Sequence, residues 1–479
     1  MRPRRASWRR ARPRSWRRWR APVGSPARSS AKTQASQTSC PMPRCRAPRP
    51  GPALHRAGDT MLTRREILGA VGGLALTLAN PGPGRAQDSA RVSGPAFVGA
   101  DGSPLKLKGI NLGNWLVPEG YFFGFNENAN SPRDIEQVAA ELLGPDDAKA
   151  FWDAYRDVFV AREDIALIAR LGFNLVRVPL DHRLFLVDAA QGPVDGPGFA
   201  LLDRLIAWCR AEGIFVVPDL HCAPGGQTGT NIDNSFAYPF LLKSERSQAR
   251  AQLFWERMAE RYAGEPAILG FDLLNEPVAN FLSYDVPDLQ SRLTALYGRL
   301  AQAVRRHDAN RILFMTDRAA LRGLRDPNVA LTFHLYWTPD VGENWISEPL
   351  KFREETGLPL WMGESGENTS QWVAQFRGLL ERHDIGWCFW PYKKLFDERA
   401  VVTADPPKSW PTIAAYARGP RPSMWAVLKS RPNLDVAASI WSELLAGLQL
   451  SRCVLNTGFV DALGLDAGGA AHQLVRKVR

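Results

Sequence analysis

After residue 90 the sequence repeats one unit, in which a helical stretch ends at a glycine and a short apolar run follows. In residues 162–171, Ile165, Ile168 and Leu171 share one helical face, and Gly172 then precedes the strand-like run 173–179. Helical patterns at 199–212 and 247–262 lead in the same way into the runs 214–221 and 268–275. This alternation constrains the fold more than any other feature of the chain.

Eight strand candidates can be placed, at 105–111, 173–179, 214–221, 268–275, 312–316, 331–336, 359–363 and 386–391. Strands that alternate with helices predict a parallel sheet, and eight of them predict closure into a barrel. An open doubly wound sheet usually binds its ligand at a Gly-rich turn, and no GxGxxG pattern occurs. We therefore predict an α/β fold, a (β/α)8 TIM barrel that forms a single catalytic domain over residues 87–450.

Polar side chains gather where the apolar runs end. In a barrel these ends converge on one rim, where active sites are built. The residues that follow this rule are Asn111, Arg177, His221, Asn275, Glu276, His334, Tyr336, Glu364 and Trp390. Seven of the eight runs end in this way, which predicts an active site at that rim.

Two of these residues are carboxylates on strands that face each other across a closed barrel. Glu276 ends the fourth run and Glu364 ends the seventh. Retaining glycoside hydrolysis needs two carboxyl groups about 5–5.5 Å apart, one to protonate the leaving oxygen and one to attack the anomeric carbon. An exposed Glu after a strand is also common as a plain loop residue. A catalytic role for the pair is therefore inferred from the residues around it.

Leu273-Leu-Asn-Glu-Pro277 and Met362-Gly-Glu-Ser365 resemble the catalytic motifs of glycoside hydrolase family 5, the cellulase family. The resemblance covers roughly residues 100–420 and implies a TIM barrel of this size. The eight active-site residues of the family have counterparts in the same order: Arg177, His221, Asn275, Glu276, His334, Tyr336, Glu364 and Trp390.

The resemblance implies that Glu276 is the acid/base and Glu364 the nucleophile. The chemistry of the other side chains suggests a role for each of them. Asn275 can bond the sugar 2-hydroxyl, and Arg177 can lower the pKa of Glu364. Tyr336 can orient the nucleophile, and partial burial beside Glu364 would favour a protonated Glu276. Binding of sugar hydroxyls suits the histidines His221 and His334, and ring stacking suits Trp390.

Other interpretations stay open at this stage. His221 and His334 could be structural, Arg177 could form a barrel ion pair, and Trp390 could be core. The set His221, His334, Asp219 and Glu364 could bind a metal, but no paired HxH or HExxH spacing occurs, so we predict neither metal nor cofactor. A β-mannanase, a transglycosylase and a non-catalytic glycan-binding barrel remain alternatives to β-glucan hydrolysis.

Two further segments favour a β-glucan, with β-1,3 or β-1,4 linkages. Gly109–Leu116 is similar to segments of family members that act on β-glucans, and His221-Cys-Ala-Pro-Gly-Gly-Gln227 is similar to the exo-β-1,3-glucanase branch, although Cys222 stands where glycine is typical. Trp115, Trp337 and Trp372 are candidate stacking platforms. We expect the aromatics of 121–125, in the long connection 117–160, to fold over the cleft and either block or line it.

The ends of the chain carry no barrel pattern. Residues 1–60 are rich in Arg and Pro, which predicts a disordered leader, or untranslated sequence ahead of a start at Met61. Residues 61–86 resemble a twin-arginine export signal, with Arg64, Arg65 and an apolar run from Ala70 to Ala79. That run is too short for a stable span, although an uncleaved anchor is the alternative. Export to the periplasm or beyond the cell is predicted.

The formal net charge of +11 is misleading. Residues 1–60, with Asp59 as their single acidic residue, alone carry a net positive charge larger than +11. The rest of the chain therefore has a net negative charge, which disfavours nucleic-acid binding. Cys40 and Cys45 lie in the leader, and Cys209, Cys222, Cys388 and Cys453 form no CxxC pair, which disfavours zinc and a disulfide framework. We expect a monomer, a helix at 437–450 that completes the outer ring, and a C-terminal tail at 451–479.

Overall fold

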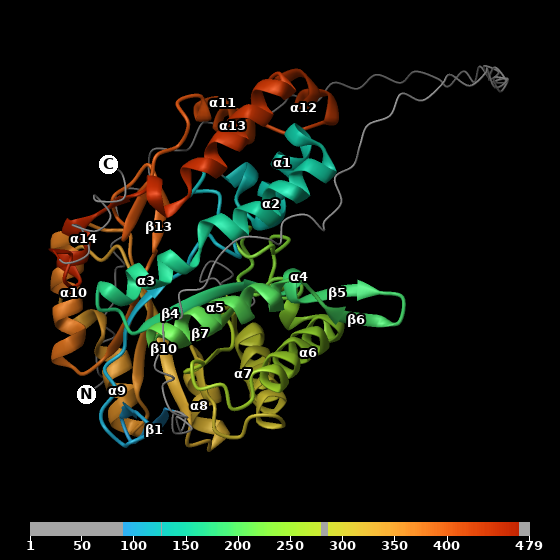
Figure 1. Ribbon diagram of the computed structural model, residues 1–479. Helices are drawn as coiled ribbons and strands as arrows, with labels where there is room; N and C mark the ends of the chain where they lie inside the picture. Colours follow the sequence, from blue (N-terminus) through green and yellow to red (C-terminus); the bar gives the residue numbers. More distant parts are fainter. Residues whose placement is uncertain (1–89, 126, 279–285, 469–479) are drawn as a thin grey trace, which may run out of the picture. The chain divides into compact units, whose positions relative to one another are not determined.

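Eight parallel strands close into a barrel in the computed structural model, which describes residues 90–125, 127–278 and 286–468 (Figure 1). The leader, the export signal, Cys40, Cys45 and residues 469–479 of the tail lie outside these residues. In chain order the barrel strands are β3 (Lys108–Asn111), β4 (Leu175–Asp181), β7 (Phe215–Cys222), β8 (Gly270–Asp272), β9 (Ile312–Met315), β10 (Val329–Tyr336), β11 (Leu360–Gly366) and β12 (Gly386–Phe389). Neighbours in the chain are neighbours in the barrel, and β12 pairs with β3 to close it. The predicted TIM barrel is confirmed.

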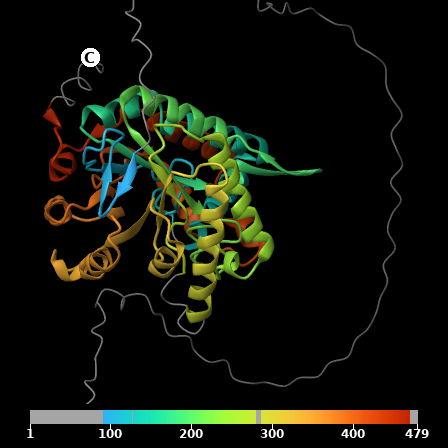
Figure 2. The same ribbon diagram turned by 90° about the horizontal axis from the view of Figure 1, so that it is seen from below.

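Helices connect the strands on the outside of the barrel (Figure 2). Their ends follow local chemistry: α5 ends at Gly213 in the left-handed region, and the side chains of Ser244 and Thr369 cap the first turns of α6 and α10. The connecting helices are α3 (Arg162–Arg170), α5 (Gly198–Glu212), α6 (Glu245–Arg261), α7 (Val286–Arg305), α8 (Arg318–Leu324), α9 (Ser347–Thr356) and α10 (Ser370–Arg382).

Apolar side chains fill the lower interior of the barrel. Phe314 of β9 and Trp361 of β11 lie 4.5 Å apart between ring centroids, and Phe97 packs on Phe314 at 5.9 Å. Phe97 belongs to the hairpin of β1 (Arg91–Ser93) and β2 (Ala96–Val98), which therefore closes the end of the barrel opposite the carboxyl ends of the strands. With that end sealed, access to the interior is left to the rim that carries the polar residues.

The long connection after β3 differs from its predicted role. It holds η2 (Glu127–Ala129), α1 (Pro132–Leu143) and α2 (Pro145–Phe159). Phe122, Phe123 and Phe125 are buried in the core rather than facing the cleft, and Phe125 stacks on Trp410. The prediction that these rings block or line the cleft was wrong for the three phenylalanines, because they join the main hydrophobic core, where Phe123 packs against Trp410 and Trp441. Only Tyr121 of this stretch reaches the site.

The C-terminal part packs against this connection. The predicted helix at 437–450 occurs as α13 (Leu434–Gly447), but it contacts α1 and α2 instead of completing the ring around the barrel. The remaining elements are α4 (His182–Phe185), η3 (Phe240–Leu242), η4 (Glu343–Trp345), α11 (Trp410–Arg418), α12 (Met424–Ser430), η5 (Leu450–Arg452) and α14 (Thr457–Ala462), with the pair β5 (Leu186–Ala189) and β6 (Gly192–Asp195) and the sheet β13 (Lys393–Leu395), β14 (Val402–Ala404) and β15 (Val454–Leu455). The β5–β6 hairpin projects from the body in both views (Figures 1 and 2).

Two smaller observations concern cysteines and membranes. Cys209 and Cys388 are buried, and the four cysteines of the described residues are free thiols. Among the helices of the described part of the chain, none combines the length and apolar character that crossing a bilayer requires.

Candidate active site

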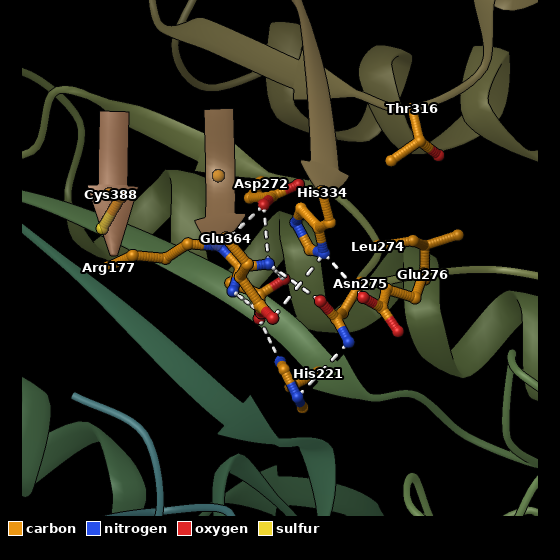
Figure 3. A network of polar contacts seen from close by, with 12 residues as sticks. Arg177, His221, Asp272, Leu274, Asn275, Glu276, Thr316, His334, Glu364 and Cys388 are labelled. Atoms are coloured by element: carbon orange, nitrogen blue, oxygen red, sulfur yellow. Dashed lines mark hydrogen bonds and ion pairs between the residues drawn. The ribbon is translucent and has the colours of Figure 1, made fainter. Parts of the chain in front are cut away.

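Arg177 of β4 lies at the centre of the polar network (Figure 3). Its guanidinium is fully buried and meets three carboxylates: Asp219 at 3.1 Å, Asp272 at 2.9 Å and Glu364. Its Nη2 also donates to Oδ1 of Asn275 at 3.0 Å. A buried cation with this many anionic partners stays charged and fixes their positions.

Glu364 lies on β11 and is almost fully buried. Arg177 donates to one carboxylate oxygen, and the Tyr336 hydroxyl donates to the other at 3.0 Å. Burial opposes ionisation, but the charges of His334 and Arg177 outweigh it and lower the pKa of Glu364 to about 2. This carboxylate is therefore ionised at any ordinary pH, as a nucleophile must be.

Glu276 follows β8 and lies in different surroundings. Its backbone has a φ of +39°, an uncommon value for a residue other than glycine, and its side chain is 46% exposed. Its Oε1 lies 2.8 Å from Nδ1 of His334. One oxygen of Glu276, one oxygen of Glu364 and one ring nitrogen of His334 all lie within 4.8 Å of one another.

That carboxylate spacing bears on which of two kinds of glycosidase chemistry is possible. Carboxyl groups about 5–5.5 Å apart suit a direct attack on the sugar, whereas an inverting enzyme leaves about 6.5–9.5 Å for a water molecule. The observed spacing fits the first case. Among the described residues, Glu276, His334 and Glu364 are also the one group with the spacing of metal ligands, and it does not include Asp219 or His221 from the metal set considered above.

His221 and Trp390 form a wall of the site. The two rings are stacked with centroids 5.8 Å apart and planes 11° from parallel. Nδ1 of His221 contacts Asp219 at 2.7 Å; burial opposes the charged imidazole, but Asp219 outweighs it and raises the pKa of His221 to about 9. The Trp390 indole donates to the Tyr121 hydroxyl at 2.7 Å. The two rings and Tyr121 thus hold one another in place.

The Gln227 side chain joins two of the loops that carry the site. Its Nε2 donates to the backbone oxygens of His221 at 2.6 Å and Asn275 at 3.0 Å. Asp233 in turn accepts from the backbone N–H of Gln227 at 2.6 Å. The segment that resembles the exo-β-1,3-glucanase branch is therefore a brace behind the site, which links the rim residues of β7 and β8.

Glu119 is a site residue that sequence reasoning missed. It is buried, and its Oε1 lies 3.9 Å from Nε2 of His221. Burial raises the pKa of Glu119 to about 8, so the carboxyl is neutral at pH 7 and can donate a hydrogen bond. It stands in the loop after β3 with no motif and no periodicity around it, and only the fold brings it to the rim.

The structure brings all eight predicted site residues to one end of the barrel. Asn111 also lies there and accepts from Nη1 of Arg177 at 3.1 Å. The three candidate stacking tryptophans differ in exposure, since Trp115 and Trp372 are buried and Trp337 is 72% exposed. The Trp337 ring lies beside Tyr336, with ring centroids 5.2 Å apart. Trp337 alone among them has a face free to meet a sugar.

Comparison with known proteins assigns the family. The sequence profile described as Cellulase (glycosyl hydrolase family 5) matches residues 143–394, which is more than half of the chain. The chain belongs to glycosyl hydrolase family 5. It is a glycoside hydrolase that acts on β-glycosides.

The relatives of this family 5 protein carry several names. It is 28% identical over 360 residues to a beta-xylosidase of Phanerodontia chrysosporium, which covers 66% of this chain and 73% of the relative. It is 35% identical to a probable glucan 1,3-beta-glucosidase A of Emericella nidulans, over 36% of this chain and 42% of the relative, so less than half of that enzyme is matched. Endoglucanase C of Acetivibrio thermocellus is 24% identical, over 52% of this chain and 88% of the relative.

Among solved structures, an endogalactoceramidase superposes on this family 5 chain with a TM-score of 0.52. The match covers 78% of this chain and 84% of that one at 18% sequence identity. At such low identity the likeness shows the shared barrel fold and nothing finer.

Proposed function

We propose that this family 5 enzyme hydrolyses β-glucosidic bonds in a β-glucan, with retention of configuration. The observation that carries the proposal is the spacing of Glu276 and Glu364, whose nearest oxygens lie within 4.8 Å of each other. A sugar ring held between them can be attacked by one carboxylate while the other protonates the glycosidic oxygen.

The proposed reaction has two steps. In the first, an oxygen of Glu364 bonds to the anomeric carbon as the glycosidic bond breaks, and Glu276 gives its proton to the leaving oxygen. In the second, Glu276 accepts a proton from water, the water oxygen bonds to the anomeric carbon, and Glu364 is released as a carboxylate. Asn275, whose side-chain oxygen accepts from Arg177 at 3.0 Å, would bond the sugar 2-hydroxyl during both steps.

The glucan assignment rests on the segment that holds Gln227 and on the names of relatives. Glucan 1,3-beta-glucosidase and endoglucanase both occur among them, which favours β-1,3 linkages first and β-1,4 second. Because one relative is named a beta-xylosidase, xylan is added to the substrates to be tested. The twin-arginine-like segment 61–86 supports export as part of the proposal.

The test is release of reducing sugar from β-1,3-glucan, β-1,4-glucan, β-1,6-glucan, mannan and xylan, with the first product followed by NMR. We expect one glucan to be preferred and its first product to have the β configuration of the substrate. An α product would contradict retention, and mannan or xylan as the preferred polymer would contradict the glucan assignment. Transfer to added sugar acceptors in place of hydrolysis would identify a transglycosylase. Loss of activity in chelator would show a metal dependence that we do not expect.

A further inference from the structure

The short helix α12 (Met424–Ser430) presents its large apolar side chains to solvent. Met424 is 70% exposed and Trp425 65% exposed, and Leu428 on the same side of the helix is also exposed. Val427 is the one buried side chain of the helix. A seven-residue helix does not form alone, so the surrounding structure holds this apolar face outward at a cost in free energy.

The start of α13 extends the apolar surface. Leu434 and Val436, which follow the Arg431-Pro-Asn turn after α12, are both about half exposed. Together with Met424, Trp425 and Leu428 they form a cluster of exposed apolar residues within thirteen positions of the chain, which we call the α12 patch. Isolated exposed apolar residues need no explanation, but a cluster of this kind marks a surface that meets a partner.

Positive charges flank the α12 patch. Arg421, Lys429 and Arg431 lie within or beside it, against Asp435 as the acidic residue of this stretch. Nζ of Lys429 lies 5.3 Å from the centroid of the Trp425 ring, so its ammonium is held at the edge of the apolar surface. Arg421 pairs with Glu141 at 2.7 Å, which leaves Lys429 and Arg431 as the other cations of this stretch. The patch is locally basic on a domain that is acidic on balance.

This charge decides among possible occupants. Residues 1–60 are strongly basic and would be repelled, and a second copy that docked patch to patch would bring like charges together. Exposed Trp, Met and Leu side chains beside Lys and Arg are typical of segments that lie in a bilayer interface, with the rings and chains among the acyl groups and the cations at anionic headgroups. We propose that the α12 patch docks this enzyme peripherally on an anionic lipid surface.

The place of α12 in the fold gives the docking a direction. α13 contacts α1 and α2, and these two helices belong to the connection that leaves β3 at its carboxyl end. Figure 1 shows α12 and the closed end at β1 on opposite sides of the molecule. Docking through the α12 patch therefore holds the catalytic end of the barrel, rather than its sealed end, near the lipid surface.

The test is sedimentation with vesicles, using a chain that begins at Gln87. The barrel and both apolar cores are built from residues 90–468, so this chain retains the described fold and omits the basic leader. Vesicles of equal parts phosphatidylglycerol and phosphatidylcholine are expected to bind it, pure phosphatidylcholine to bind it less, and added salt to weaken the binding.

The triple variant Met424→Ser, Trp425→Ser, Leu428→Ser is expected to lose binding by roughly tenfold or more, because it removes the apolar anchors. Its matched control is Val187→Ser with Val194→Ser, two half-exposed residues of the β5–β6 hairpin that should leave binding unchanged. Hydrolysis of a soluble glycan and the melting temperature verify that both variants are folded. No binding by the parent chain, equal binding by the triple variant, or a dimer that the triple variant abolishes would overturn the proposal.

Discussion

The two glutamates proposed as catalytic lie in unlike halves of the site. The side chain of Glu364 is 7% exposed and is held by Arg177 of β4 and by Tyr336 of β10, the strand adjacent to its own. That of Glu276 is 46% exposed, and it forms a hydrogen bond with His334. A fixed, buried anion suits a nucleophile whose charge must persist, whereas an open carboxyl suits a group that exchanges protons with solvent and with leaving groups. Removal of the buried Glu364 is therefore expected to abolish the reaction itself, whereas removal of the open Glu276 is expected to impair proton transfer.

The largest effect is expected for Glu364→Ala. Without the nucleophile no glycosyl-enzyme forms, so kcat/KM should fall by roughly 10⁴-fold or more on every substrate, whatever its leaving group. The measurement is initial rates on the preferred glucan and on an aryl β-glucoside with an acidic phenol. Glu343→Ala, which removes an exposed surface carboxylate, is the control and should leave both rates unchanged. A residual rate within tenfold of the parent would mean that another residue is the nucleophile.

Glu276→Ala should separate the two halves. Loss of the general acid costs roughly 10²–10⁴-fold on the glucan, but much less on the aryl glucoside, because an acidic phenol leaves without protonation. The glycosyl-enzyme should then accumulate, and azide should restore turnover by attacking it, giving a β-glucosyl azide. If glucan and aryl glucoside were lost to the same extent, the acid/base assignment would be wrong.

Tyr336→Phe removes one hydrogen bond to Glu364 but leaves the carboxylate itself in place. The phenol donates to Glu364 at 3.0 Å, and a hydrogen bond to a charged group contributes about 1.5–3 kcal/mol, so kcat/KM should fall by roughly 10- to 150-fold. The variant should also shift the pH profile. The nucleophile works only when ionised, so activity is lost as the pH falls through the pKa of Glu364, which is about 2 in the parent chain. Removal of the donor raises that pKa, and the acid limb should move to higher pH.

A stability measurement checks the same pKa independently. Because the pKa of Glu364 in the folded chain lies below its ordinary value of 4.5, ionisation stabilises the fold at higher pH, and this contribution is lost as the pH falls from 4.5 toward 2. Tyr336→Phe should reduce that acid-sensitive contribution. An acid limb that stays in place would show that Tyr336 does not act on the ionisation of Glu364.

The contrast between the halves also explains what the sequence could predict. Strand ends were predictable because apolar runs and terminal glycines are local signals, and the rim residues follow directly from those ends. Asp272 and Asp219 lie inside runs that read as plain strands, so a barrel ion pair of Arg177 could be named as an alternative but its partners could not. Glu119 was missed because a loop places it. The buried phenylalanines of 122–125 were misassigned because pattern alone does not show which core an aromatic side chain joins.

The smallest effect is expected at Trp337, which extends the open half of the site. It follows Tyr336 at the end of β10, is 72% exposed, and has a φ of +52°, so its ring is held outward at a backbone value that side chains rarely adopt. If the ring stacks on a sugar beyond the cleavage point, Trp337→Ala should raise KM severalfold for long glucan oligomers, with kcat nearly unchanged and short aryl glucosides unaffected. Trp345→Ala is the matched control, since that ring is also exposed but its nitrogen donates to Asp340. An equal rise in KM for short and long substrates would mean that Trp337 positions Tyr336 beside the buried Glu364 and does not stack on a distant sugar.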